Sequence, residues 1–225
     1  MEQVKKRKLN FKKIFIALLL IYLIIYLFST VIRTSIKNIY IFGEDKLSEQ
    51  EVLELAKIDN YPSCFLTSTK SIKKKILGSP YVKDVKVEKK WFCTINIHIE
   101  ENKKLFIKRS DQKLVLENGL EIKTDNKVNN VPLLINYVPE KVYKGLISKM
   151  SLINDSILSK VSEIEYNPND LDDERFLLSM GDGNYVYVTL FNFDSLNYYL
   201  ETLPKLEGKK GILYFDVGNY FEIIE

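Results

Sequence analysis

The chain has 225 residues, of which 46% are hydrophobic, with 33 basic and 30 acidic side chains and a net charge of +3. This length suits one or two small domains, and the apolar content is ordinary for a globular protein. The near balance of charge gives no reason to expect a nucleic-acid partner, and we predict none.

The charge is unevenly placed along the chain. Residues 1–13 carry six basic side chains against one acidic one, whereas Ile14–Ile32 contains no charge, proline or glycine. As a helix, this apolar run would cover roughly 28 Å, close to the ~30 Å hydrocarbon core of a bilayer. We therefore predict a cytoplasmic basic tail at residues 1–13 and a transmembrane helix at residues 14–33, with the rest outside.

A cleaved signal peptide is the alternative for this apolar run. Such a peptide has an apolar part of about 7–15 residues and a cleavage site of small residues. The run here is longer, and the exit sequence "FSTVIRTSIK" lacks such a site. We therefore expect an uncleaved anchor with single-pass type II topology.

Residues 34–102 have a compact pattern of strand, two helices and two strands. "SIKNIYIFG" predicts a strand that ends at Gly43, and "LSEQEVLELAKI" predicts an amphipathic helix whose start at Ser48 and Glu51 fits a capping box. "SIKKKILGS" predicts a second helix, and "YVKDVKVEKKW" and "TINIHIEE" alternate with period two, as strands of a one-sided sheet do. Two helices on one face of three strands suffice to bury a small core.

The chain has two cysteines, Cys64 and Cys93, both placed outside the membrane by this topology. They could pair, because that compartment can be oxidising, or they could be two small buried hydrophobes. We favour unpaired cysteines, because two do not make a disulfide framework. Cys64 lies in the loop "YPSCFLTST", which we expect Phe65 and Leu66 to anchor.

Residues 103–225 predict a second module, rich in hairpins. "KLFIKRSDQKLVLENGLEIK" reads as three strands, "NNVPLLINY" as an extended linker and "PEKVYKGLISKMSLIND" as a helix that starts at Pro139. "SILSKVSEIEYNPND" leads into a strand, "RFLLSMGDGNYVYVTL" is a hairpin that turns on Asp182-Gly183, and "FDSLNYYLETLPKLEG" is a helix capped by Asp194. The hairpins predict an antiparallel sheet with helices on one side.

Little in the chain indicates catalysis. Its one histidine, His98, lies on the polar face of a predicted strand, and there is no GxSxG, HExxH or phosphate-binding glycine loop. The acidic run Asn167–Glu174 lacks the central glycine and the ligand spacing of an EF-hand loop, so we interpret it as a solvated loop. We predict no catalytic residue, no cofactor and no metal site, and favour a binding or scaffolding role.

The last predicted hairpin, "GILYFDVGNYFEIIE", has two apolar strands, Ile212–Val217 and Tyr220–Ile224, and turns at Gly218-Asn219. An open strand edge is normally an aggregation liability, but it can also accept a strand from a partner. No polar tail follows, so we expect this edge to be open. The alternative is that Tyr220, Phe221 and Ile223 only seal the core of the second module. The predicted partner-binding residues are Tyr214, Phe215, Val217, Tyr220, Phe221 and Ile223.

Several stretches resemble one known family. "IYIFGEDKLSEQEVLELAKI" and "SIKKKILGSPYVKDVKVEKKWFCTINIHIEE" resemble the two halves of a POTRA domain. "LVLENGLEI", "VPLLIN" and "YNPNDLDDERFLLSMGDGNYVYV" follow in the order of the bacterial cell-division family DivIB/FtsQ. The layout of basic tail, one span and two outside modules also resembles that family. One departure is Phe92, where the family often has proline.

The resemblance implies an α+β fold: a single N-terminal transmembrane helix, a POTRA domain at residues 34–102, and a second antiparallel β-sheet domain with packed helices at residues 103–225. It implies a non-enzymatic scaffold of the divisome in the cell membrane at the division septum. Such proteins bind FtsL-like and DivIC-like (FtsB in some bacteria) single-span proteins and help to assemble and regulate septal peptidoglycan synthesis. A septal peptidoglycan synthase is a further candidate partner. The competing hypotheses are a membrane-anchored POTRA assembly or chaperone module and a cell-wall enzyme.

Overall fold

The computed structural model describes residues 11–43, 47–123, 130–218 and 220–224. Helix α1 (Phe11–Ile32) has no buried residue and is apolar on every side. Within the described residues, it is the one helix whose length and composition suit a membrane span. By its contacts the chain divides into two units, residues 1–101 and residues 102–225.

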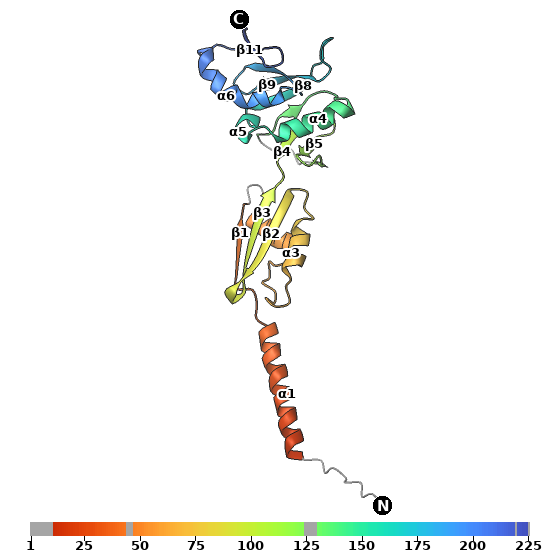
Figure 1. Cartoon of the computed structure of the whole chain (residues 1–225), viewed down its shortest axis with the longest axis vertical. Helices are drawn as coiled ribbons and strands as arrows, with labels where there is room; N and C mark the ends of the chain where they lie inside the picture. Colours follow the sequence, from red (N-terminus) through yellow and green to blue (C-terminus); the bar gives the residue numbers. More distant parts are fainter. Residues whose placement is uncertain (1–10, 44–46, 124–129, 219, 225) are drawn as a thin grey trace, which may run out of the picture. The chain divides into compact units, whose positions relative to one another are not determined.

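The folded part of the first unit has the predicted order of strand, two helices and two strands. Its sheet has the order β1-β3-β2, in which β1 runs parallel to β3 and β2 runs antiparallel to it. Figure 1 shows α3 against one face of these strands. The elements are β1 (Asn38–Phe42), α2 (Glu49–Ala56), α3 (Thr69–Ile76), β2 (Val82–Lys90), the short 3-10 helix η1 (Trp91–Cys93) and β3 (Thr94–Glu101).

Two local features predicted for this unit are confirmed, the capping box at Ser48 and the strand end at Gly43. The Ser48 Oγ accepts from the Glu51 N–H at 3.3 Å, and the Glu51 carboxylate accepts from the Ser48 N–H at 2.7 Å, which completes the capping box. Gly43 has a φ of +83°, and a Cβ there would lie 2.3 Å from the Ile99 carbonyl oxygen. Only glycine fits at this strand end. The apolar faces of both helices and the sheet close one core of Val52, Ala56, Ile72, Ile76, Val85, Ile95, Ile97 and their neighbours.

Two predictions for this unit are wrong. Cys64 and Cys93 form a disulfide, with their Cα atoms 5.6 Å apart although 29 positions separate them in the sequence. The β2–β3 turn carries Cys93 back to the loop that holds Cys64, a proximity that residue spacing cannot reveal. Phe65 and Leu66 are exposed and anchor nothing in the core, because the buried Cys64 fills that position.

The second unit contains one nine-stranded sheet with the order β12-β11-β10-β9-β8-β7-β4-β5-β6. Its strands are β4 (Lys104–Lys108), β5 (Lys113–Leu116), β6 (Glu121–Lys123), β7 (Leu133–Leu134), β8 (Val161–Tyr166), β9 (Arg175–Met180), β10 (Tyr185–Thr189), β11 (Gly211–Tyr214) and β12 (Tyr220–Ile223). Its helices are α4 (Glu140–Ser151), α5 (Asp155–Leu158), the 3-10 helix η2 (Phe193–Tyr198), α6 (Tyr199–Thr202) and the 3-10 helix η3 (Leu203–Leu206).

A second β-sheet domain was predicted correctly, but its sheet is mixed and not antiparallel throughout. β7 lies parallel to both β4 and β8, and β10 lies parallel to β11. β7 comes from the segment predicted as a linker. It is two residues long and inserts between its neighbours, which no hydrophobic periodicity could indicate. The connection from β10 to β11 passes through η2, α6 and η3, and such crossovers produce parallel pairs.

The helices of this unit supply the apolar side chains that cover the sheet. Val142, Leu146 and Met150 on α4 belong to the same core as Phe106 and Phe176 from the strands. The predicted cap at Asp194 is wrong. Asn192 precedes the helical segment, which begins as the 3-10 helix η2, and no side chain caps it.

Candidate functional site

The candidate site is the edge of the second sheet formed by β12. β12 is the last strand in the sheet order and pairs with β11 alone among the described strands. The pairing is antiparallel, with Leu213 opposite Phe221 and Tyr214 opposite Tyr220. A strand in this position leaves half of its backbone groups without a strand partner.

The direction of these backbone groups follows from one hydrogen bond. The Ile224 N–H donates to the Lys210 carbonyl at 3.0 Å, and this pair continues the register of β11 with β12. Because hydrogen-bonded and non-bonded pairs alternate in an antiparallel ladder, Glu222 and Tyr220 also point toward β11. The N–H and C=O groups of Phe221 and Ile223 therefore point outward.

Gly211 sets how closely β12 approaches β11. A Cβ at Gly211 would lie 1.9 Å from the Glu222 carbonyl oxygen, so no larger residue fits without moving β12. The Gly211 N–H donates in the opposite direction, to the buried Asn184 Oδ1 at 3.1 Å. Asn184 in turn donates to Asp182 Oδ1, and Tyr199 donates its hydroxyl to the same carboxylate. Burial, together with the hydrogen bond to Asp182, raises the pKa of the Tyr199 hydroxyl.

One face of the hairpin borders a groove of about 530 Å³. Its walls come from Tyr198, Thr202 and Lys205 on the helical segment before β11, and from Tyr220 and Phe221 on β12. Leu213 and Phe215 also line it, although both are buried. A chain laid along β12 would find this groove beside it for the side chains that point to that face.

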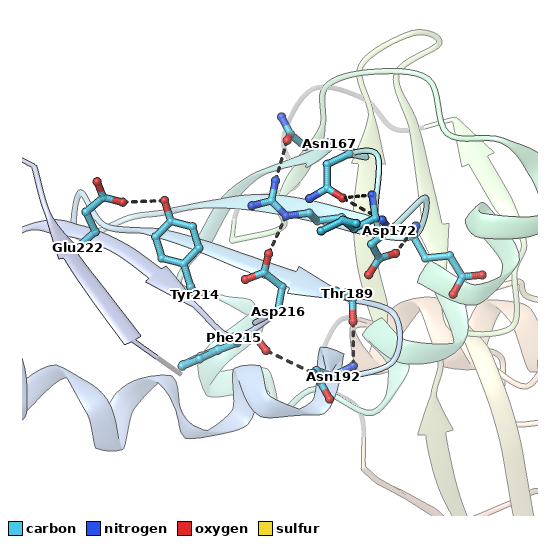
Figure 2. Close-up of polar contacts among 12 residues, drawn as sticks. Asn167, Asp172, Thr189, Asn192, Tyr214, Phe215, Asp216 and Glu222 are labelled. Carbon is cyan, nitrogen blue, oxygen red and sulfur yellow. Dashed lines mark hydrogen bonds and ion pairs between the residues drawn. The ribbon is translucent and has the colours of Figure 1, made fainter. Parts of the chain in front are cut away.

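The other face of the hairpin carries a row of aromatic rings. Tyr214 stacks between Tyr187 and Tyr220, with ring centroids 5.3 Å and 4.4 Å away. Figure 2 shows the Tyr214 hydroxyl donating to Glu222, at 2.8 Å. This hydrogen bond, with burial and the negative charge of Glu222, raises the pKa of Tyr214 to about 12.

The structure distributes the six predicted partner-binding residues unevenly. Tyr220 and Ile223 are exposed on β12, and Val217 is exposed in the turn. Phe221 is half-buried against the core and Tyr214 lies within the aromatic row. Phe215 is only 6% exposed and its side chain belongs to the core. The predicted strand Ile212–Val217 ends earlier, at Tyr214, and residue 219 of the predicted turn lies outside the described residues.

Fewer of the predicted residues are therefore exposed at the edge than we expected. The alternative, that these side chains seal the core, holds for one of them. Of the three residues that could have sealed the core, Phe221 alone packs against it, while Tyr220 and Ile223 remain exposed. The groove beside the edge depends on the helical segment before β11. Sequence reasoning missed it, because no local pattern shows which helix lies next to which strand.

A second pocket, of about 560 Å³, lies between β4, β6 and α4. Inside it, the Glu121 carboxylate accepts from Lys108 Nζ at 3.0 Å and from the Tyr143 hydroxyl at 2.8 Å. Burial raises the pKa of Glu121, but these hydrogen bonds and nearby lysines outweigh that effect and lower it overall. A carboxylate held ionised in this way is a structural partner and a poor proton acceptor.

Comparison with known proteins identifies the class of the first folded domain. The model of the FtsQ-type POTRA domain matches residues 34–102. The folded part of the first unit is therefore a POTRA domain, with the apolar helix α1 before it and the β-sheet domain of the second unit after it.

The matches extend over almost the whole chain. The cell division protein DivIB of Bacillus subtilis is 29% identical over 98% of this chain and 85% of its own length. DivIB of Listeria monocytogenes is 24% identical over 97% of this chain and 83% of its own length. A solved structure, the major extracytoplasmic domain of the trans isomer of DivIB from Geobacillus stearothermophilus, is 23% identical with a TM-score of 0.41, covering 48% of this chain and 96% of that one. The resemblance to the DivIB/FtsQ family is confirmed, and this chain is a POTRA-containing relative of the DivIB proteins.

Proposed function

We propose that this protein is a non-enzymatic, single-span scaffold of the bacterial divisome. Its relatives over nearly the full length are cell division proteins. The helix α1 would anchor it, with the basic residues before the helix in the cytoplasm and both folded units outside. Its partners would be FtsL-like and DivIC-like single-span proteins, and its role would be to assemble and regulate septal peptidoglycan synthesis.

The observation that carries this proposal is the open edge of β12. The outward N–H and C=O groups of Phe221 and Ile223 can pair with one added strand from a partner. Main-chain hydrogen bonds would supply affinity, and the groove beside Phe221 would select among side chains. Confinement of both partners to one membrane raises their effective concentration, so this short edge can suffice.

The direction of the amides determines which substitution tests the proposal. A proline at Tyr220 would remove a hydrogen bond to β11 and disturb the hairpin itself. Ile223→Pro removes an outward N–H, and proline is tolerated on an edge strand in this position. Ile223→Ala keeps the amide and removes the side chain. Comparing the two variants therefore separates the contribution of the main-chain hydrogen bond from that of the isoleucine side chain.

The chain offers a matched control at the other edge of the same sheet. The Leu116 N–H donates to the Leu120 carbonyl, and by the alternation of the ladder the Lys123 N–H points away from β5. Lys123→Pro therefore removes an outward amide from an edge to which the proposal assigns no partner.

The measurement is recovery of DivIC-like and FtsL-like proteins with each variant, from membranes crosslinked in living cells and analysed by mass spectrometry. Leaving one interface hydrogen bond unmade costs about 1–3 kcal/mol, so recovery with Ile223→Pro should fall by about fivefold or more. Recovery with Lys123→Pro should remain at the wild-type level. Equal recovery with both variants would contradict the edge proposal, and recovery of many unrelated unfolded proteins would favour a chaperone.

A further inference from the structure

Four large apolar side chains are exposed together on two loops of the POTRA domain. These side chains are those of Phe65, Leu66, Trp91 and Phe92, named here the loop patch, and they are between 58% and 88% exposed. The first two follow Cys64 and the last two precede Cys93, so the disulfide joins the two loops. An exposed apolar cluster of this kind marks an interaction surface.

The backbone under the loop patch does not favour an aromatic residue. Phe92 has φ 59° and ψ 32°, and the next residue, Cys93, has φ 58°. This left-handed region suits glycine or asparagine, and turns of this kind prefer Asn-Gly. Neither core packing nor turn geometry therefore accounts for Phe92. Its exposed ring is better explained by a contact outside the domain.

The loop patch lies next to the end of helix α1. The Cys64 N–H donates to the Thr34 carbonyl at 2.8 Å, and the Ser63 hydroxyl donates to the carbonyl of Ile32, the last residue of α1. Two residues of chain span at most about 7 Å, so Thr34 cannot be farther than this from the helix end. The headgroup layer on each face of a bilayer is about 5–8 Å thick. The loops therefore begin within its depth if α1 crosses the membrane.

We infer that the loop patch inserts into the headgroup layer of the bilayer that α1 crosses, and this inference rests on the membrane anchoring proposed above. Tryptophan and other aromatic rings favour this layer, where one side is apolar and the other wet. The exposed Arg33 and Lys37 lie at the same end of the domain and complement anionic headgroups. The Lys37 N–H donates to the Cys93 carbonyl at 3.0 Å, which attaches the β2–β3 turn to this basic segment.

The consequence is a second point of attachment for the POTRA domain. With α1 alone, only the hydrogen bonds of Ser63 and Cys64 to the chain around the end of α1 would hold the domain in place. With the loop patch in the lipid, the domain is held at one height and one tilt relative to the membrane. The crosslink between Cys64 and Cys93 keeps the two loops together, so they insert as one unit.

The test uses the fact that Trp91 is the chain's only tryptophan. The full chain is placed in nanodiscs of phosphatidylcholine and phosphatidylglycerol, one chain per disc, with or without bromine on the acyl chains near the headgroups. Tryptophan emission is then measured, along with quenching by iodide in the water. The inference predicts loss of emission in the brominated discs and protection from iodide.

A matched control moves the tryptophan to the other end of the same sheet. Phe42 is exposed and lies four pairs along β3 from the β2–β3 turn, about 13 Å away. In Trp91→Phe/Phe42→Trp, iodide should quench the emission and brominated lipid should not. In Phe92→Asn, which suits the left-handed backbone, with Leu66→Ser, the emission of Trp91 should become more accessible to iodide.

Emission from Trp91 that iodide quenches and brominated lipid leaves unchanged would overturn the inference. Protection from iodide without lipid quenching would also overturn it, because protein and not lipid would then cover the loop patch. Failure of the chain to remain with the discs would overturn the anchoring itself. Recovery of division partners is not part of this readout, so the proposed function can fail or hold separately.

Discussion

Arg175 on β9 and Asp216 in the turn after β11 form a buried ion pair, with the arginine Nε 2.7 Å from the aspartate Oδ2. Their side chains are only 11% and 3% exposed. The guanidinium also lies 3.4 Å from the centroid of the Tyr187 ring and donates to Asn167 Oδ1 at 3.1 Å. Figure 2 shows both bonds, one from the arginine Nε to Asp216 and one from the guanidinium to Asn167. The pair therefore ties the turn between β11 and β12 to the interior of the sheet.

Removing one member of this pair should destabilise the second unit strongly. Asp216→Ala would leave the arginine charge buried without its counter-ion, which costs about 3–5 kcal/mol of unfolding free energy. Urea denaturation measures this loss. Asp170→Ala, which removes an exposed aspartate from the loop before β9, should change stability by less than about 0.5 kcal/mol. Equal stability of the two variants would show that the ion pair contributes nothing.

This pair also shows the limit of sequence reasoning for the fold. Local patterns were sufficient where a residue acts on its own neighbours, as Ser48 does in the capping box. Arg175 and Asp216 lie 41 positions apart, and Cys64 and Cys93 lie 29 apart. Whether such residues meet depends on strand order and crossovers. No local sequence pattern predicts the short strand β7 or the parallel strand pairs, because these too depend on strand order and crossovers.

Gly211 offers a second prediction, about the position of β12. Gly211→Ala places a methyl group against the Glu222 backbone oxygen, so β12 must move away from β11. We expect a loss of about 1–3 kcal/mol, as for other overpacked positions, and faster hydrogen exchange at the Ile212 and Glu222 amides. Gly181→Ala is the matched control, since its Cβ would meet nothing nearer than 3.4 Å. Exchange at wild-type rates in Gly211→Ala would contradict the prediction.

The disulfide supplies a third prediction. Closing a loop of 29 residues should stabilise the POTRA domain by about 3.5 kcal/mol through the entropy of the unfolded chain. The double variant Cys64→Ala/Cys93→Ala should lose about this amount, measured by denaturation in membrane-mimetic discs. Reduction of the wild-type protein should reproduce most of the loss. A double variant as stable as the oxidised wild type would contradict the prediction.

Part of the candidate site could be read from the sequence, and part could not. The alternation of apolar residues around Gly218 predicts a hairpin at the end of the described chain, and β11 and β12 confirm it. Alternation cannot tell how far a strand continues, so Phe215 and Val217 were expected on one strand. In the structure Phe215 packs in the core and Val217 lies in the turn. The groove and the aromatic row also depend on the helical segment before β11 and on β10, and the sequence does not show that the chain brings these elements beside the hairpin.

The hydrogen bond from Tyr214 to Glu222 makes stability depend on pH in the alkaline range. In the unfolded chain the tyrosine hydroxyl has a pKa near 10, and in the folded chain its pKa is about 12. Between these values the folded state holds the proton that the unfolded state has lost. The stabilisation is therefore fully present below about pH 10 and is lost as the pH rises toward 12.

Two variants isolate this effect from the other titrating groups. Tyr214→Phe removes the hydroxyl, so the difference in unfolding free energy between it and the wild type should be constant below about pH 10 and change only above it. Glu222→Gln removes the charged acceptor and should return the pKa of Tyr214 toward its ordinary value. The measurement is the absorbance of the phenolate as the pH is raised. The curve of Tyr214→Phe is subtracted from those of the wild type and of Glu222→Gln, which leaves the ionisation of Tyr214. A wild-type Tyr214 that ionises at the same pH as in Glu222→Gln would contradict the prediction, because the hydrogen bond across β11 and β12 would then be absent in solution.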